Sequence, residues 1–267
     1  MAYAVTWDAV GEHLYETGTK QGMVYPAKAD GTSTSFDYTD STTDPATSIT
    51  GLSTPYGAGA AWNGLREVNL QPSGADETKL YADDIKYLSL RAAEEFGCTI
   101  GAYTSPTQFD VCDGSAQPAT TVNGVTFGQQ KRRSFGFSYV STLGNDVLMN
   151  DYGYVIHLIY GLTASPSEKD HNTINDSPEA AELSWECSSV PVAVDGYKPV
   201  STIEIEVSTR TGLMTISGDT VTISNKVKAL ENILYGKAPT TVGGNDGVDP
   251  RLPDPASILK IFASGNG

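Results

Sequence analysis

Several residue types are scarce in this sequence, and each shortage excludes a class of protein. Cysteine occurs only at positions 98, 112 and 187, an odd number at wide spacings that gives neither a disulfide framework nor a CxxC metal pair. Basic residues number 17 against 32 acidic ones, for a net charge of −15, which argues against binding a nucleic-acid backbone. No apolar run approaches the ~20 residues that span a bilayer. We therefore expect no membrane segment.

Motifs of catalysis and ligand binding are also missing from the sequence. There is no Walker loop, no GxGxxG segment opening a helix, no HExxH and no GxSxG nucleophile motif. His157 lies inside an apolar segment, where a hydrogen-bonded core histidine is more typical than a catalytic base. We expect no enzymatic activity, no cofactor and no metal.

The residues that are abundant favour a protein rich in strands and turns. Charged residues make up only 18% of the chain, below the ~25% of ordinary globular proteins, whereas glycine (27) and tyrosine (14) are plentiful. The three cysteines fit small buried thiols in a reducing compartment. The first residues contain no basic stretch followed by an apolar one, so we expect the chain to stay in the cytoplasm where it is made.

Alternating and apolar segments predict strands between about residues 62 and 224. Residues 135–139 alternate aromatic and small side chains, and residues 153–161 are apolar on both faces, which favours a central strand covered on both sides. Residues 202–208 place Ile203, Ile205 and Val207 on one face and two glutamates on the other. Residues 214–224, centred on Gly218 and Asp219, predict a hairpin.

Helices are predicted at fewer places. Residues 226–235 carry an apolar stripe of Val227, Leu230, Ile233 and Leu234, with Gly236 placed as the C-terminal left-handed residue. Two further segments suit short helices: residues 105–113, with Ser105 as N-cap, and residues 253–262, with Ile258, Leu259 and Phe262 inward. Local spacing of apolar residues also favours a helix at 83–96.

The first sixty residues look different from the rest. Glycines and a proline interrupt any period in residues 1–30, which predicts an extended arm. Residues 31–60 are rich in Thr, Ser, Asp and Gly, which predicts a loop or mobile hairpin that is flexible or ordered by a partner.

Ordered short segments along the chain resemble one known family. They are KLYADDIK (79–86), TIGAYTSP (99–106), GFSYVSTLGND (136–146), LIYGLTAS (158–165), SPEAAELSWE (177–186), GYKP (196–199), ALENILYG (229–236) and PRLP (250–253). In this order and spacing the sequence resembles the major tail protein, the tail tube subunit, of long-tailed bacteriophages of the siphophage type. The resemblance covers most of the chain, from about Glu16 to Phe262.

The resemblance implies a mainly β fold: a β-sandwich of two packed antiparallel sheets flanked by an α-helix. It divides the chain into an extended N-terminal arm and inter-subunit loop (1–60), a tail tube domain (61–262) containing the helix 226–235, and a tail (263–267). It reads residues 80–103 as strands and a turn, with at most a short helical piece at 91–96, and we follow it there against the local helix prediction.

The resemblance also implies a function and partners. Such subunits form hexameric rings that stack into the tube of the virion, and the inner sheets join into one continuous barrel through which DNA is ejected without specific binding. The expected partners are further copies of the chain, a tape measure protein inside the tube, and tail terminator or distal tail proteins at its ends. The acidic composition agrees, because like charge on the wall keeps a polyanion moving.

Two sets of residues are candidates for these roles. The candidates for the acidic lumen wall are Glu67, Asp83, Asp84, Glu204 and Glu206. The candidates for contacts between subunits are the aromatic residues Tyr15, Tyr25, Phe36 and Tyr38 and the basic run Lys131, Arg132 and Arg133.

Two other functions are weighed against the tail tube. A secreted β-sandwich module that binds carbohydrate or a cell surface would explain the Tyr, Trp, Asp and Thr content, but it calls for an export signal. A hydrolase calls for a nucleophile and a base in a specific arrangement.

Overall fold

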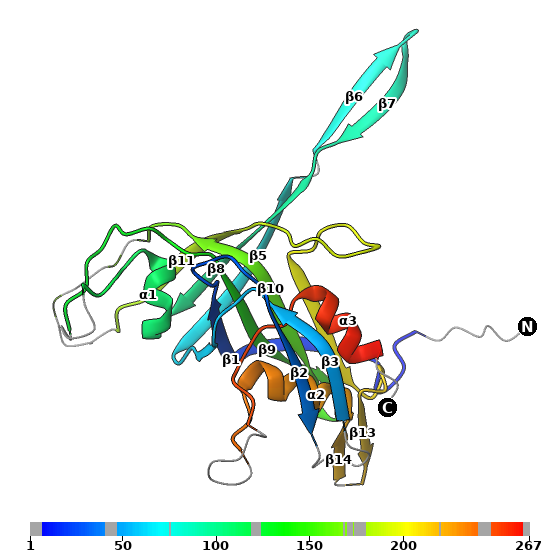
Figure 1. Cartoon of the computed structure of the whole chain (residues 1–267). Coiled ribbons are helices and arrows are strands. Elements are labelled where there is room, and N and C mark those ends of the chain that lie inside the picture. Colours follow the sequence, from blue (N-terminus) through cyan, green and yellow to red (C-terminus); the bar gives the residue numbers. More distant parts are fainter. Residues whose placement is uncertain are drawn as a thin grey trace, which may run out of the picture.

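One large antiparallel sheet forms the body of the chain, as the computed structural model in Figure 1 shows. The structure describes residues 7–40, 47–74, 76–118, 124–167, 169, 173, 180–218, 220–239 and 247–263. The large sheet has eight strands, and all its pairings are antiparallel. In spatial order they are β4 (Ala60–Ala61), β1 (Tyr15–Pro26), β9 (Phe135–Asn145), β10 (Met149–Ala164), β11 (Leu183–Ser189), β8 (Glu94–Ala102) and β5 (Leu65–Gly74), with β12 (Thr202–Ser208) pairing β10 outside this path.

Smaller elements surround this sheet. The two-stranded sheets are β2 (Thr34–Asp40) with β3 (Thr47–Thr54), β6 (Glu77–Ala82) with β7 (Ile85–Arg91), and β13 (Met214–Ser217) with β14 (Thr220–Ile223). The helical elements are η1 (Thr107–Phe109), α1 (Asp110–Asp113), α2 (Asn225–Tyr235) and α3 (Pro255–Ala263). The prediction of a mainly β fold with antiparallel sheets and a flanking helix is confirmed.

Strands β9 and β10 are central because their side chains are apolar on both faces. Strand β10 pairs β9 along most of its length and β12 over residues 153–159, and both β9 and β10 are largely buried. A strand covered on both sides loses the usual alternation of polar and apolar residues. The predicted central strand at 153–161 is therefore confirmed, as are the strand at 202–208 and the hairpin around 218.

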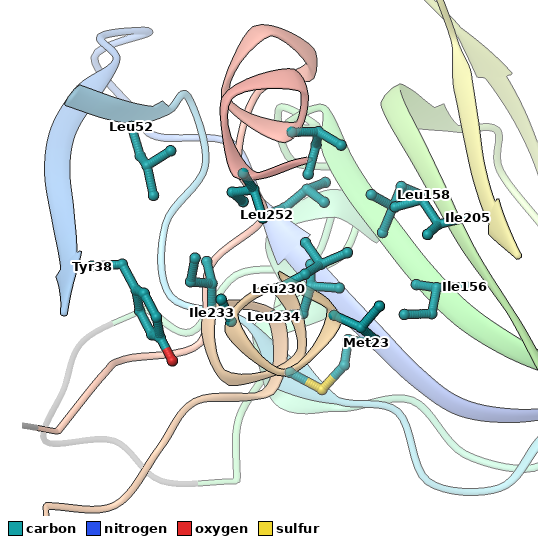
Figure 2. Packing of buried hydrophobic residues seen from close by; sticks show 14 of the residues in the cluster. Met23, Tyr38, Leu52, Ile156, Leu158, Ile205, Leu230, Ile233, Leu234 and Leu252 are labelled. Atoms are coloured by element: carbon teal, nitrogen blue, oxygen red, sulfur yellow. The ribbon is translucent and has the colours of Figure 1, made fainter. Parts of the chain in front are cut away.

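The first hydrophobic core lies between the large sheet and a layer made of α2, α3 and the β2–β3 sheet (Figure 2). The predicted stripe of α2 is fully buried. The side chain of Ser224 caps this helix by accepting a hydrogen bond from the backbone N–H of Lys226 at 3.4 Å. Gly236 follows the helix with a positive φ of 83°, as expected, but its ψ of 155° is not that of a left-handed helical residue.

The second core fills the other side of the sheet near β8 and β11. Trp62 packs on Phe109 with ring centroids 4.6 Å apart and on Trp185 at 5.3 Å. The short helical segment η1–α1 supplies Phe109 and Cys112 to this core, so the predicted short helix at 105–113 is present. Its N-cap is Pro106 and not Ser105, and no side chain caps it.

The prediction of an extended arm over residues 1–30 is wrong for the described part of that segment, whereas the hairpin predicted as one alternative for residues 31–60 is present. Strand β1 pairs β9 within the large sheet, and β2–β3 forms a hairpin packed on the body. The reason is that Met23, Tyr25, Tyr38, Ile49 and Leu52 supply large apolar side chains to the first core, which offsets the cost of ordering a polar, glycine-rich stretch. Residues 1–6 and 41–46 lie outside the described residues.

The reading of residues 80–103 as strands and a turn, preferred over the local helix spacing at 83–96, is confirmed: these residues form the end of β6, a turn, β7 and β8, and residues 91–96 contain no helical piece. One helix prediction needs correction. In α3, Ile258 and Ile261 are buried, whereas Leu259 is exposed although it was predicted to face inward. Residues 264–267 of the predicted tail lie outside the described residues.

Candidate functional site

The hairpin β6–β7 projects from the body of the molecule (Figure 1). It continues the ladder that β5 forms with β8, which runs from Leu65 opposite Ala102 to Gly74 opposite Glu94. Every residue of β6, and all but one residue of β7, is exposed. The hairpin therefore makes almost no packing contact with its own chain.

One face of this hairpin is apolar. Residues directly opposite each other on antiparallel strands share a face, and successive residues alternate between faces. Thr78 lies opposite Leu90, Leu80 opposite Leu88, and Ala82 opposite Ile85. We call these six residues, Thr78, Leu80, Ala82, Ile85, Leu88 and Leu90, the apolar hairpin face.

The other face of the hairpin is polar. It carries Glu77, Lys79 and Lys86, and the Lys86 Nζ lies 2.6 Å from the Glu77 Oε1. This ion pair holds the pKa of Glu77 below its ordinary value. Tyr81 and Tyr87 near the tip are 69% and 73% exposed. The hairpin is therefore amphipathic, and no second layer of the described residues packs on its apolar face.

The turn and the root of the hairpin have special backbone conformations. Asp83 and Asp84 both have positive φ, 49° and 60°, as a type I′ turn requires, and aspartate tolerates this region better than most residues. At the root, Gly74 has a φ of 88°, and a Cβ there would lie 2.5 Å from the Ala93 carbonyl oxygen. Only glycine fits this junction between β5 and β6.

A second polar feature lies on the large sheet around His157. Its ring stacks on Tyr139 with centroids 4.4 Å apart. Its Nε2 lies 2.8 Å from the Ser141 Oγ and 3.1 Å from the Glu16 Oε1. Its Nδ1 lies 3.6 Å from the Glu204 Oε1 and makes no hydrogen bond. The histidine thus sits between two carboxylates from β1 and β12.

This group does not work as a nucleophilic triad, although serine, histidine and glutamate follow one another in space. The Ser141 hydroxyl donates to Glu16 at 2.5 Å, so its proton is not directed to the histidine. Ser141 is also only 3% exposed, which leaves no room for a substrate at its oxygen. The group is a polar cluster of the sheet in which His157 is hydrogen-bonded through its Nε2 alone, in line with the expectation of a hydrogen-bonded core histidine.

The structure does not bring the five lumen candidates together. Glu204 and Glu206 share a face of β12, Glu67 lies on β5, and Asp83 and Asp84 form the hairpin tip. Glu206 is bound by Arg210 and by Ser208, and Arg210 holds the pKa of Glu206 below its ordinary value. Glu67 likewise contacts Arg66 at 2.6 Å. Of the candidates on strands, Glu204 has the most exposed side chain, at 60%.

The residues predicted to contact other subunits have mixed surroundings. Tyr25 and Tyr38 are fully buried in the first core, so their side chains are not available to a neighbouring molecule. Phe36 is partly buried beneath Arg251, and the exposed Tyr15 donates to the Asn150 side chain at 3.0 Å. In the basic run, Arg132 donates to the Asp113 carbonyl, whereas Lys131 and Arg133 are exposed.

The apolar hairpin face is the site that sequence reasoning missed. In the sequence, the residues of this face alternate with those of the other face in 78–82 and 85–90, on either side of two aspartates. One extra residue, Tyr87, interrupts this alternation in the second strand. Because of this β-bulge, Leu88 follows Ile85 at the i, i+3 spacing of a helix and not at the even spacing of a regular strand. A register with a bulge therefore imitates a helical period.

Neither a metal site nor a membrane-spanning helix is found where the structure describes the chain. No group of three or more His, Cys, Asp or Glu side chains among the described residues could hold a metal ion. None of the helices in the described ranges is both long enough and apolar enough to cross a bilayer.

No protein-family model matches the chain, and no curated protein matches it. Among solved structures, it has a likeness to a chain in the cryo-EM structure of the anti-feeding prophage (AFP) baseplate, 6-fold symmetrised. The TM-score is 0.29 and the identity 6%, over 75% of this chain and 97% of that one. A likeness at that level carries no argument about fold or function.

Proposed function

We propose that this chain is a structural subunit of a phage tail, the tail tube protein of a siphophage, which assembles with copies of itself into stacked hexameric rings. The observation that carries the proposal is the apolar hairpin face, which nothing among the described residues covers. An exposed, contiguous apolar surface on a projecting strand pair marks an interaction site. The sequence resemblance to tail tube subunits supports the same assignment.

A projecting hairpin suits assembly into rings because it makes a heterologous contact. If the hairpin of one copy packs on the body of the next, the same contact repeats around a closed ring or along an open helix. Strand β12 offers a suitable acceptor, since β10 is its only pairing partner in the described part of the sheet. A strand from a neighbour could add to this free edge and join the sheets of successive copies.

The charge of the chain suits a conduit for DNA. At a net charge of −15, a wall built from this protein would repel the phosphate backbone and keep it moving. On this proposal the protein is made in the host cytoplasm and works in the virion without catalysis. Its partners are a tape measure protein inside the tube and tail terminator or distal tail proteins at the ends.

The proposal is tested by assembly of the purified chain at rising concentration, followed by electron microscopy and sedimentation. We expect rings or tubes of uniform diameter. Replacing Leu80 and Leu88 by serine should abolish them, because this pair forms the middle of the apolar hairpin face. The matched control is Val221→Ser, an exposed apolar residue on the β13–β14 hairpin, which should assemble normally.

Two results would contradict the proposal. One is a wild-type chain that stays monomeric at every concentration and ionic strength while binding a carbohydrate or cell surface, which supports the secreted module. The other is normal assembly of the Leu80→Ser, Leu88→Ser variant with unchanged circular dichroism, which removes the hairpin from the contact.

A further inference from the structure

Two of the three cysteines face each other across a strand ladder. Cys98 on β8 lies directly opposite Cys187 on β11, and the next pair on the same face is Ile100 opposite Trp185. Both cysteines are buried, at 1% and 6% exposure, and both side chains point into the second core. The third cysteine, Cys112, comes from the short helix α1. All three are free thiols in this structure.

The ladder places the two facing cysteines within the range of a disulfide. Opposite residues on antiparallel strands have Cα atoms about 4.5 or 5.5 Å apart, depending on the pair type, and side chains on the same face. Disulfides span Cα separations of roughly 4.4 to 6.8 Å. Contact with the Cys98 thiol, together with burial, raises the pKa of Cys187 above its ordinary value.

We propose that Cys98 and Cys187 form an intramolecular disulfide when the chain meets a low-molecular-weight disulfide such as oxidised glutathione. One cysteine thiolate attacks a sulfur of the oxidant, which forms a mixed disulfide and releases one glutathione thiolate. The second cysteine thiolate then attacks the protein sulfur of that mixed disulfide and releases the other. The two protein thiols are oxidised, oxidised glutathione is reduced to two thiols, and the protons of both cysteines leave with them.

Such a bond would link β8 covalently to β11. Strand β8 directly follows the projecting hairpin, whereas β11 joins β10 through only the short ladder from Leu162 to Ala164. A cross-link between residues 98 and 187 closes a long loop in the unfolded chain, which should raise Tm by about 10 °C. Burial of both thiols makes the reaction slow in the folded chain. A reducing cytosol would also keep both thiols free.

The test uses wild-type protein in buffers of oxidised and reduced glutathione, both as the folded chain and during refolding from urea. We expect loss of two of the three thiols, a mass lower by two hydrogen atoms, and a proteolytic peptide that links residue 98 to residue 187. The Cys112→Ala variant should behave like wild type. Cys98→Ala and Cys187→Ala should each fail to form the link and should show no oxidant-dependent rise in Tm.

The outcomes separate the proposal from its alternatives. A link that forms only during refolding supports the pairing and shows that the folded chain shields it from the oxidant. Three free thiols in both arms, or a link through Cys112, would overturn it. The proposal rests on the strand register and not on tail assembly, so it can fail or hold independently of the proposed function.

Discussion

At the scale of single residues, Glu231 shows how burial changes a carboxyl group on the outer layer of the fold. It lies on α2 and accepts a hydrogen bond from the Tyr154 hydroxyl at 2.6 Å. Desolvation raises the pKa of Glu231 above its ordinary value, although the Tyr154 hydrogen bond and Lys228 oppose the change. A carboxyl whose pKa is higher in the folded state than in the unfolded state stabilises the fold less when it is ionised. The free energy of unfolding therefore rises as the pH falls through the folded-state pKa.

We therefore expect Glu231→Gln to raise the stability of the chain at pH 7. Glutamine keeps an acceptor oxygen for Tyr154 and removes the buried charge. The advantage over wild type should shrink as the pH is lowered and the wild-type carboxyl becomes protonated. Urea unfolding of both proteins from pH 7 to pH 4 measures this. As a matched control, Tyr154→Phe should lower the stability at pH 7 because it leaves the carboxylate without its donor.

A substitution of Glu204 tests the prediction that this residue lines the lumen. Its carboxylate is exposed, whereas Glu206 is held by Arg210, so reversing Glu204 alone changes the charge of the surface with less damage to local contacts. Around a six-fold ring, Glu204→Lys would create a positive girdle that binds phosphate. We expect intact tubes and slower DNA ejection at low salt. Glu186→Lys, on the opposite face of the sheet, makes the same change in net charge and should eject normally.

At the scale of elements, the sequence predicts those segments whose pattern is local. The apolar stripe of α2 and the doubly covered strand β10 follow from side-chain order alone. The role of β1 could not be predicted, because its partner β9 lies more than a hundred residues away, and glycines hide its pattern. The local pattern of the β6–β7 hairpin suggests a helix because of the bulge at Tyr87, and it was the family resemblance that indicated strands there. The lumen and subunit candidates could not be grouped, since residue type gives no position in space.

The helix α2 should be the principal support of the first core. Its Leu230 and Ile233 are fully buried against the sheet and the β2–β3 layer (Figure 2). Truncating Leu230 to alanine should lower the free energy of unfolding by about 2 to 5 kcal/mol. Leu259→Ala on α3 removes the same atoms from an exposed position and should change it by less than about 0.5 kcal/mol. Urea unfolding of the monomeric variants decides it, and equal effects would mean that α2 does not support the core.

At the scale of the whole molecule, charge and apolar surface act in opposite directions on assembly. Copies that each carry −15 repel one another, whereas the apolar hairpin face favours contact. Salt shortens the range of the repulsion, from about 10 Å at 0.1 M to about 3 Å at 1 M, and does not weaken apolar contacts.

Assembly should therefore begin at a lower protein concentration as sodium chloride is raised from 0.1 to 1 M. Light scattering across a concentration series at each salt level measures the onset. The Leu80→Ser, Leu88→Ser variant should remain dispersed at both. An onset that moves to higher concentration with salt would mean that ion pairs, and not the apolar hairpin face, hold the copies together.

The continuity of β5 and β8 with the projecting hairpin has a mechanical consequence. Both strands run from the body into the hairpin, so a pull on the hairpin acts along their axes. The hydrogen bonds of an antiparallel ladder lie across the strands. Because β5 and β8 are drawn outward together, such a pull loads in shear the β8–β11 ladder, which connects them to the rest of the sheet, and the bonds of that ladder must yield together and not one after another. The element that reaches away from the body is thus anchored in the direction in which a β-sheet best resists force.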